Sequence, residues 1–311
     1  MKNSEEKMNI VLCLNSGYLM PSSVCIYSIL KNNKDGINFY IIHSGLLNSE
    51  LRHLENIIKN ENMENNLVSI LVGKTTFDDS PTFGRSKEAF YRLLIPDLLP
   101  KDLKRCLYLD GDVLVTKNIS DFYFESFEDN ALIVCEDIGE ILFFSKEQHS
   151  KLDIPLNYKY FNSGVLIFNL EYFREKFGTV NFVNFMNSHG NLKFLDQDVL
   201  NGTCFDKVKY SNSAKYNLQE ILINPIVTNQ AVEKAAIIHF LQKPWRVNYR
   251  GVNSDMWWSY GKHLYRPKYI KFIFLNTLYQ KALAILLLFV SIANIKKTAT
   301  IISRFRIKID A

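Results

Sequence analysis

Hydrophobic and polar residues alternate along this chain in blocks whose length and spacing predict strands and helices in turn. Short apolar runs at 10–14, 38–42 and 67–72 have the length of buried strands. Between these runs, residues 21–31 and 48–59 place apolar side chains at the spacing of one helix face. Strands that alternate with helices are typical of a mostly parallel sheet. The pattern therefore predicts an α/β fold with helices on both faces of the sheet.

The same pattern continues through the middle of the chain. A helix is expected over residues 87–94, ending near Pro96, before a further apolar run that stops at Asp110. Beyond this point the pattern predicts strands at 131–135, 165–168 and 235–240 and helices at 171–177 and 180–186. No repeat or Gly/Ser-rich linker interrupts the chain before Leu264, so we expect residues 1–263 to form a single domain.

The most informative stretch is Leu107–Val115, where apolar residues run up to Asp110 and resume at Val113. Gly111 lies between Asp110 and Asp112 and permits a sharp turn that aims both carboxylates at one point. Two carboxylates at the carboxyl end of a buried strand are typical ligands of a divalent cation that bridges phosphates. The alternative is a solvated Asp-Gly turn between two strands, and the stretch alone does not decide between them.

The composition favours a large folded domain. The chain has 311 residues, of which 47% are hydrophobic and 13% aromatic, and this is enough for a sizeable core.

The five cysteines are scattered and mostly lie in apolar stretches, so we expect reduced thiols and a reducing compartment. Residues 1–8 are polar and lack the basic and apolar regions of a signal peptide, which predicts a cytoplasmic protein. No Cys-x-x-Cys or His-Glu-x-x-His pattern is present, which excludes the usual zinc sites.

The charge is distributed unevenly. The net charge is +5, yet from Leu264 onward nine basic residues accompany a single acid, Asp310. Within this tail, residues 282–295 are nearly all apolar and are bounded by lysines, but the run is shorter than the ~20 residues of a spanning helix. We therefore expect residues 264–311 to form a membrane-associating segment in the interface of an anionic leaflet. The alternative is a helix packed on the domain with its lysines in water.

Five short motifs follow one another in the order Tyr91-Arg92, 107–112, 161–165, Asp196-Gln197-Asp198 and His239–Trp245. Together they resemble family 8 of the retaining glycosyltransferases, in particular the bacterial lipopolysaccharide α-galactosyl- and α-glucosyltransferases, over residues from about 10 to 245. The resemblance implies a GT-A fold, which is Rossmann-like with a mostly parallel sheet and helices on both faces. It also implies retaining transfer of galactose or glucose from a UDP-hexose, with Mn²⁺, or Mg²⁺ in its place, as the cofactor.

The resemblance assigns roles to individual residues. The implied metal ligands are Asp110, Asp112 and His239, and the implied hexose contacts are Arg92, Asn162, Asp196 and Gln197. Gln197, with Asp196 beside it, is the implied catalytic residue and lies beneath the anomeric carbon. Lys243 would contact the phosphates, and Asn15 would contact the base. The implied partners are the UDP-hexose, a saccharide or lipid-linked saccharide acceptor and the inner face of the cytoplasmic membrane, with no nucleic acid.

Two features depart from the family pattern. Members often carry an acid after the first strand that reads uracil, whereas this chain has Asn15 there. Between His239 and Lys243 the family usually has a glycine-containing linker, whereas here only Phe240-Leu241-Gln242 intervene. These departures leave open a nucleotide-sugar-binding protein without activity. An inverting enzyme is a further alternative, and it would need a carboxylate base in place of Gln197.

Overall fold

The structure of the chain is a computed structural model that describes residues 7–75, 77, 86–139, 145–190, 192–220, 229–246, 253–279 and 281. The chain divides into two compact units. The first comprises Met1–Lys243 with Gly251–Asn253, and the second comprises Pro244–Arg250 with Ser254–Ala311. The predicted division of roles, with a catalytic domain over 1–263 and a membrane-associating segment over 264–311, stays a proposal.

Most described strands of the first unit lie close to the positions that the apolar runs predict, whereas the short strands over 208–210 and 218–219 were not predicted. They are β1 (Met8–Leu14), β2 (Ile37–His43), β3 (Asn66–Leu71), β4 (Arg105–Leu109), β5 (Val113–Val115), β6 (Leu132–Glu136), β7 (Phe161–Asn169), β8 (Val208–Tyr210), β9 (Leu218–Gln219) and β10 (Ile237–His239). Most of them are buried along their whole length, which is why they read as continuous apolar runs.

Helices connect these strands. In chain order they are η1 (Ser16–Tyr18), α1 (Leu19–Asn32), α2 (Asn48–Glu61), η2 (Lys87–Leu94), α3 (Ile95–Leu98), α4 (Ser120–Tyr123), α6 (Ser145–Lys151), α7 (Leu170–Lys176), α8 (Thr179–His189), α9 (Asp196–Cys204), α10 (Ser213–Tyr216) and α11 (Asn229–Lys234), with α12 (Ser254–Leu264) in the second unit. The alternation of strands and helices in the amino-terminal half is the one that the periodicity predicts.

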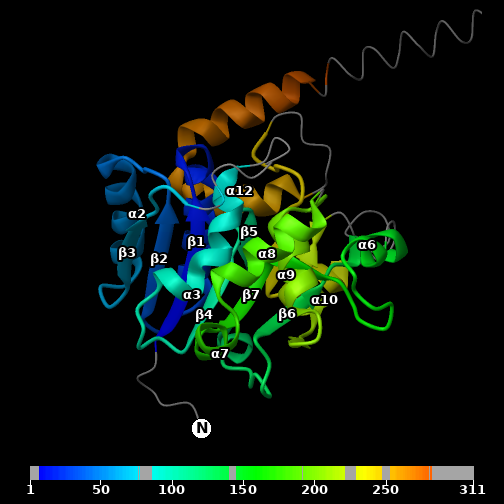
Figure 1. The fold of residues 1–311 in the computed structure, drawn as a ribbon. Coiled ribbons are helices and arrows are strands. Elements are labelled where there is room, and N and C mark those ends of the chain that lie inside the picture. The colour runs from blue at the N-terminus through cyan, green and yellow to red at the C-terminus, as the bar shows by residue number, and fades with distance from the viewer. Residues whose placement is uncertain are drawn as a thin grey trace, which may run out of the picture. The chain divides into compact units, whose positions relative to one another are not determined.

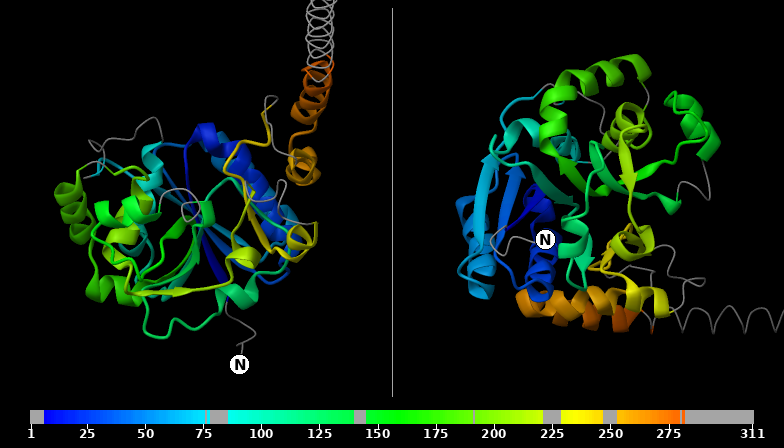
Figure 2. Two further views of the ribbon diagram at one scale, coloured as in Figure 1. Left: turned by 90° about the vertical axis from the view of Figure 1, so that its right-hand side faces the viewer. Right: turned by 90° about the horizontal axis from the view of Figure 1, so that it is seen from below.

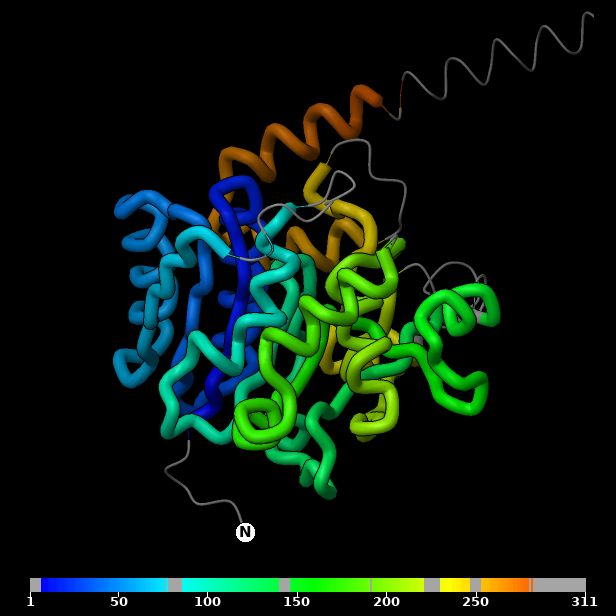
Figure 3. Tube along the Cα trace, in the orientation of Figure 1, coloured from blue at the N-terminus to red at the C-terminus, as the bar shows by residue number. Residues whose placement is uncertain are grey.

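The main sheet has the strand order β3-β2-β1-β4-β7-β6-β8 (Figure 1). Neighbouring strands are parallel except around β7, which runs antiparallel to both β4 and β6. The prediction of a mostly parallel sheet is confirmed. Figure 3 shows that β1, β4 and β7 lie side by side although they are far apart in sequence. Because β7 runs in the opposite direction, its amino end lies at the edge where β1 and β4 have their carboxyl ends.

Helices cover both faces of this sheet (Figure 2). On one face, α1 and α2 pack against each other beside the amino-terminal strands. On the other face, η2, α7, α8 and α9 share a core with alternate residues of the strands, such as Val11, Tyr108 and Leu166. Successive strand residues point to opposite faces, so each buried strand contributes to both layers.

A second, smaller sheet has the order β5-β10-β9 and determines where the late part of the chain lies. β10 pairs antiparallel with β5, so that His239 lies opposite Val113. The backbone N–H of Phe240 also donates to the carbonyl of Asp112 at 3.0 Å. This pairing brings the end of β10 directly beside the Asp110-Gly111-Asp112 turn.

Two sequence predictions need correction. The helix expected over 87–94 has the predicted bounds and ends near Pro96, but it is a 3-10 helix, and Pro96 itself lies in the first turn of the following helix α3. Proline is tolerated there because the first N–H groups of a helix have no intrahelical partner. The strand expected over 165–168 is longer than predicted, because Phe161–Gly164 also belong to β7. Antiparallel pairing with β4 and β6 extends this strand beyond its most apolar part.

The second unit is helical in its described part and rich in aromatic residues. It contains α12 and a further helix over residues 266–279. Trp258 packs edge-on against Trp257 at 4.8 Å between ring centroids and also contacts Tyr269 and Phe272. The apolar run 282–295 lies outside the described residues. Among the helices that the structure describes, none has the length and apolar character needed to cross a membrane.

Candidate active site

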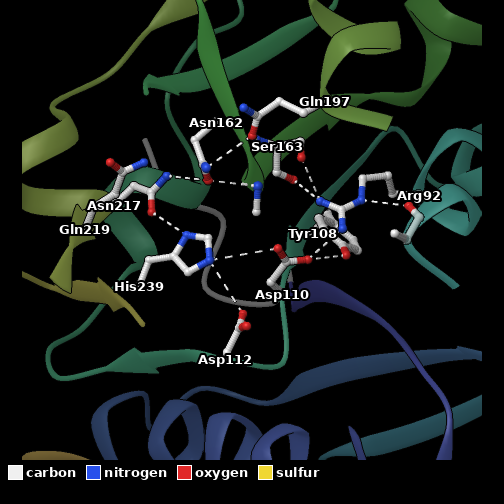
Figure 4. Close-up of polar contacts among 12 residues, drawn as sticks. Arg92, Tyr108, Asp110, Asp112, Asn162, Ser163, Gln197, Asn217, Gln219 and His239 are labelled. Atoms are coloured by element: carbon white, nitrogen blue, oxygen red, sulfur yellow. Dashed lines mark hydrogen bonds and ion pairs between the residues drawn. The ribbon is translucent and has the colours of Figure 1, made fainter. Parts of the chain in front are cut away.

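Three potential metal ligands converge at the carboxyl edge of the main sheet (Figure 4). Asp110 follows β4, Asp112 precedes β5, and His239 ends β10. His239 Nε2 lies 3.9 Å from Asp110 Oδ2 and 3.5 Å from Asp112 Oδ1. One ligand atom from each residue fits within a group whose members are all within 4.8 Å of one another. The tertiary structure thus brings together the three residues that the sequence analysis assigned to a metal.

The orientation of His239 is determined by its other ring nitrogen. Nδ1 lies 3.1 Å from Oδ1 of Asn217, whose amide nitrogen donates to Asn162. The hydrogen-bond network therefore assigns the proton to Nδ1 and directs Nε2 towards the carboxylates, as for a metal-ligating histidine. Burial opposes protonation of His239, but the carboxylates of Asp112 and Asp110 outweigh it and raise the pKa of the imidazole.

Two observations test whether this cluster suits a cation. Within the described part of the chain, the buried Oδ1 of Asp112 accepts no hydrogen bond, so a polar atom is left for a ligand. In addition, a Cβ at Gly164 would lie 2.4 Å from His239 Cε1 and 2.7 Å from Asp110 Oδ2, so only glycine leaves both ligands in place. Two carboxylates and one imidazole are a donor set that first-row divalent ions such as Mn²⁺ accept. The residues therefore fit a divalent cation.

Burial raises the pKa of the Asp112 carboxyl, but the imidazole of His239 and the hydroxyl of Tyr18 outweigh this effect, and the pKa lies below its ordinary value. The Tyr18 hydroxyl donates to Asp112 Oδ2 at 2.8 Å. Asp112 is therefore ionised, which is the state that a metal ligand requires.

Arg92 links the acidic cluster to the catalytic residues implied by the resemblance. Its guanidinium donates to Asp110 Oδ1 at 2.9 Å and to Ser163, and it lies 3.0 Å from Asp196 Oδ2. The side chain is 6% exposed and its guanidinium also lies 4.6 Å from the ring of Tyr108. Asp110 and Asp196 are thus held at one cation, so the charges of one partly exposed and one buried carboxylate are partly compensated.

Gln197 lies at the centre of a buried amide network. Its Oε1 accepts from the backbone N–H of Ser163 at 3.0 Å and from Asn162 Nδ2 at 3.2 Å. Its Nε2 donates to Asp137 Oδ2 at 3.0 Å, and the same carboxylate accepts from Asn162 and from Gln219. Both ends of the Gln197 amide are therefore held, and its orientation is determined by its neighbours.

The remaining predicted residues, Asn15 and Lys243, lie on the β1 side of the metal cluster. Asn15 follows β1, and its Oδ1 accepts from the backbone N–H of Tyr18 at 3.2 Å. The Lys243 ammonium lies over the Tyr18 ring, 5.3 Å from its centroid. Tyr18 in turn contacts Asp112, so both residues lie one side chain away from the cluster. Their assigned contacts with base and phosphate stay predictions.

Sequence reasoning missed several residues of this arrangement. Asp137 directly follows the predicted strand β6, so an acid at the end of a buried strand was the available signal. Tyr108 was visible only as an apolar strand residue, yet its hydroxyl donates to Asp110 Oδ1 at 2.5 Å. Asn217 directly precedes the short strand β9 and Gln219 is its last residue, and no clear hydrophobic pattern marks this strand.

A mostly parallel sheet with a paired-aspartate turn at its carboxyl edge defines the GT-A class of glycosyltransferases, and the solved structures agree. A crystal structure of the galactosyltransferase LgtC with donor and acceptor sugar analogues matches with a TM-score of 0.74 at 21% identity. The match covers 84% of this chain and all of that one. The model of glycosyl transferase family 8 matches residues 9–248, and the chain belongs to this family. It is therefore a glycosyltransferase, and the predicted family and GT-A fold are confirmed.

Two relatives illustrate the range of similar sequences. General stress protein A of Bacillus subtilis is 27% identical over 294 residues, which cover 86% of this chain and 94% of the relative. A lipopolysaccharide glucosyltransferase of Escherichia coli K12 is 26% identical over 252 residues, which cover 75% of this chain and 73% of the relative. The chain is thus similar both to a general stress protein and to a lipopolysaccharide glucosyltransferase.

Proposed function

We propose that this chain transfers galactose or glucose from a UDP-hexose to a saccharide acceptor, with retention of the anomeric configuration and with Mn²⁺ or Mg²⁺ bound. The observation that carries the proposal is the position of the Asp110–Asp112–His239 cluster beside Arg92 and the Gln197 network. This cluster could hold a cation that binds a diphosphate, and the polar groups beside it are suited to a hexose. Both lie at the same edge of the sheet.

Asp110, Asp112 and His239 would hold the cation, which supplies positive charge to the diphosphate leaving group. Arg92 orients Asp110 and Asp196, so that the first keeps its position towards the cation and the second keeps its position towards the hexose. Lys243 contributes a further cation for the phosphates.

The chemistry of the Gln197 side chain supports a mechanism that retains the anomeric configuration. An amide oxygen carries no full charge and is a weak base, but it can stabilise positive charge that develops at an anomeric carbon. An inverting enzyme requires a carboxylate that is free to accept a proton from the acceptor. Asp137, the carboxylate in contact with Gln197, accepts hydrogen bonds from three amide side chains. Its lone pairs are therefore largely occupied.

The test of this function uses the purified full-length chain with Mn²⁺ and UDP-[¹⁴C]galactose or UDP-[¹⁴C]glucose. We expect slow release of UDP without acceptor, faster release with a suitable saccharide, and an α-linkage in the NMR spectrum of the product. The Asp112→Asn variant is the matched control. Absence of turnover with any UDP-sugar would contradict the proposed transfer, and a β-linked product would contradict retention.

We further propose that the acceptor is a lipooligosaccharide or another lipid-linked saccharide at the inner face of the cytoplasmic membrane. The helix over 266–279 exposes apolar side chains, with Ile270 60%, Phe274 63% and Leu278 48% exposed. Basic residues such as Lys271 lie on the same helix. An exposed apolar surface flanked by cations is the composition of a segment that binds anionic lipid.

A nucleotide-sugar-binding protein without transfer activity is the second candidate. It is favoured by Asn15 in place of an acid and by the short connection between His239 and Lys243. Calorimetry separates the two, because this candidate requires tight UDP binding without turnover in the assay above.

A further inference from the structure

Glu88 is a buried carboxylate that the proposed function does not use. It lies on η2, one helical turn before Arg92, and is 6% exposed. The same short helix thus presents a cation to the metal cluster and an acid to a different place at the sheet edge. Buried carboxylates require compensation, so the partners of Glu88 indicate what this acid does.

The partners of Glu88 come from the ends of two strands and from the start of its own helix. Oε2 accepts from Asn15 Nδ2 at 3.0 Å and from the hydroxyl of Ser86, and Oε1 accepts from the hydroxyl of Ser44. Burial raises the pKa of Glu88, but these hydrogen bonds outweigh it, and the pKa lies below its ordinary value. The carboxylate is ionised and can only accept hydrogen bonds, so Asn15 must turn its amide nitrogen towards it.

The opposite end of the Asn15 amide faces the loop after β1. Oδ1 accepts from the backbone N–H of Tyr18 at 3.2 Å and retains a second lone pair. A continuous series of contacts therefore leads from Glu88 through Asn15 and Tyr18 to Asp112. The orientation of Asn15 is determined from both sides, by an acceptor at its nitrogen and by a donor at its oxygen.

The order of the strands indicates which part of a donor would meet Asn15. β4, which carries the metal cluster at its end, lies between β1 and β7. Asn162 on β7 and Gln197 lie on the hexose side of the cluster, so the nucleoside at the far end of the diphosphate extends towards β1. There it meets the polar pair Asn15–Glu88, beside Tyr18.

We propose that Glu88 is a specificity-determining residue: it carries the negative charge at the nucleobase end of the donor site and holds Asn15 so that Oδ1 accepts the N3–H of uracil. This inference rests on the proposed use of a UDP-sugar. Cytosine has an acceptor at N3, so two acceptors would meet and a cytidine nucleotide is rejected. The acid that the family resemblance implies after the first strand has in this chain moved to η2.

The inference predicts that an acid at position 15 is harmful unless Glu88 loses its charge. In an Asn15→Asp variant, two carboxylates would face each other at hydrogen-bond distance, and their repulsion would displace both. Adding Glu88→Gln places an amide donor beside the new carboxylate and restores a compatible pair. A strong interaction between the two substitutions is therefore expected.

The experiment measures the Kd of UDP and of CDP by calorimetry, with Mn²⁺, for the wild type, Glu88→Gln, Asn15→Asp and the double variant. Glu88→Gln should reduce the preference for UDP over CDP about tenfold, because the Asn15 amide is then free to turn. Asn15→Asp should weaken UDP binding about tenfold, and the double variant should regain most of this loss. Thermal unfolding of each variant verifies that it is folded.

The matched control is Glu50→Gln. Glu50 is a second acid at this edge and accepts from the hydroxyl of Ser16 at 2.8 Å, but it does not contact the Asn15 amide in the described structure. It should leave the UDP-to-CDP preference unchanged. An unaltered preference in Glu88→Gln, or effects at positions 15 and 88 that simply add, would overturn the inference. Absence of UDP binding by the wild type would refute the proposed function itself.

Discussion

Arg92 is the cation that balances the charges of two carboxylates, Asp110 and Asp196, in the candidate active site. Its three guanidinium nitrogens serve Asp110, Asp196 and Ser163 at the same time. The planar, permanently charged guanidinium can donate to acceptors in several directions, whereas a lysine ammonium acts as a single point charge. The charge and the shape of this side chain are therefore both required.

We expect Arg92→Lys to lower the free energy of unfolding by about 3 kcal/mol, because at least one buried carboxylate would lose its partner. Hexose transfer should fall as well, since Asp196 is then no longer aligned. Denaturant unfolding and the UDP-release assay measure the two effects. Lys31→Arg is the control, because Lys31 pairs with Glu61 on the partly exposed surface. A stable and fully active Arg92→Lys variant would contradict this account.

A substitution at Asp112 tests whether its carboxylate is a ligand of the metal. The Asp112→Asn variant keeps the shape of the side chain and an acceptor for Tyr18 but removes the charge. We expect a folded protein whose Mn²⁺ affinity and transfer rate both fall by about 100-fold or more, beyond the effect typical of residues that only orient a ligand. Calorimetric Mn²⁺ titration and initial rates provide the measurements. A variant with unchanged Mn²⁺ affinity, or one whose rate excess Mn²⁺ restores in full, would argue against a direct ligand role.

At the scale of elements, the candidate site depends on the close approach of β7 to Asp110 and His239. Gly164 lies in this strand, and its carbonyl accepts from the backbone N–H of Asp110 at 2.9 Å. The space that a side chain would need is taken by His239 and Asp110. The strand can therefore bring its polar residues to the metal cluster only while position 164 has no Cβ.

Gly164→Ala should consequently displace His239 and weaken Mn²⁺ binding about tenfold or more, while the sheet pairing persists. The measurement is a Mn²⁺ titration combined with circular dichroism. Gly73→Ala is the matched control, since a Cβ at Gly73 meets no atom within 4 Å. Equal Mn²⁺ affinity in the two alanine variants would show that the close approach at Gly164 does not support the metal site.

At the scale of the whole molecule, the proposed membrane association depends on the second unit. Trp258 packs against Phe272 and Tyr269 within this unit. Ending the chain after residue 263 would remove both partners and expose the indole. Membrane association is therefore better tested by substituting exposed residues of the full-length chain than by truncation.

We expect Ile270→Asn combined with Phe274→Asn to reduce binding to anionic liposomes at least tenfold, because each buried apolar side chain contributes about 1.5–3 kcal/mol. Donor hydrolysis should persist, since the assigned site residues lie in the first unit. Sedimentation with liposomes measures binding, and Leu156→Asn, at a position 69% exposed in the first unit, is the control. High salt should release the wild type only in part. Unchanged sedimentation of the double variant would mean that this surface does not contact the membrane.

Most of the elements follow from the sequence because their physical cause is local. Buried strands such as β1 and β4 are continuous apolar runs, and α2 has one apolar face, so residue patterns alone locate them. The motif residues Asp110 and Asp112 could be recognised because a glycine separates two acids directly after a strand. The chain by itself thus determined the α/β class, the family and the candidate metal ligands.

Only the tertiary structure decided how these parts meet. Side-chain alternation is the same in parallel and antiparallel strands, so no residue pattern predicted the reversed direction of β7, which carries Asn162 to the metal cluster. The pairing of β10 with β5, which brings His239 beside Asp112, is equally non-local. The contact of Glu88 with Asn15 depends on η2 packing beside the end of β1, and no spacing in the sequence encodes it. Long-range strand order and helix packing, which arise from burial of the whole core, determine these contacts.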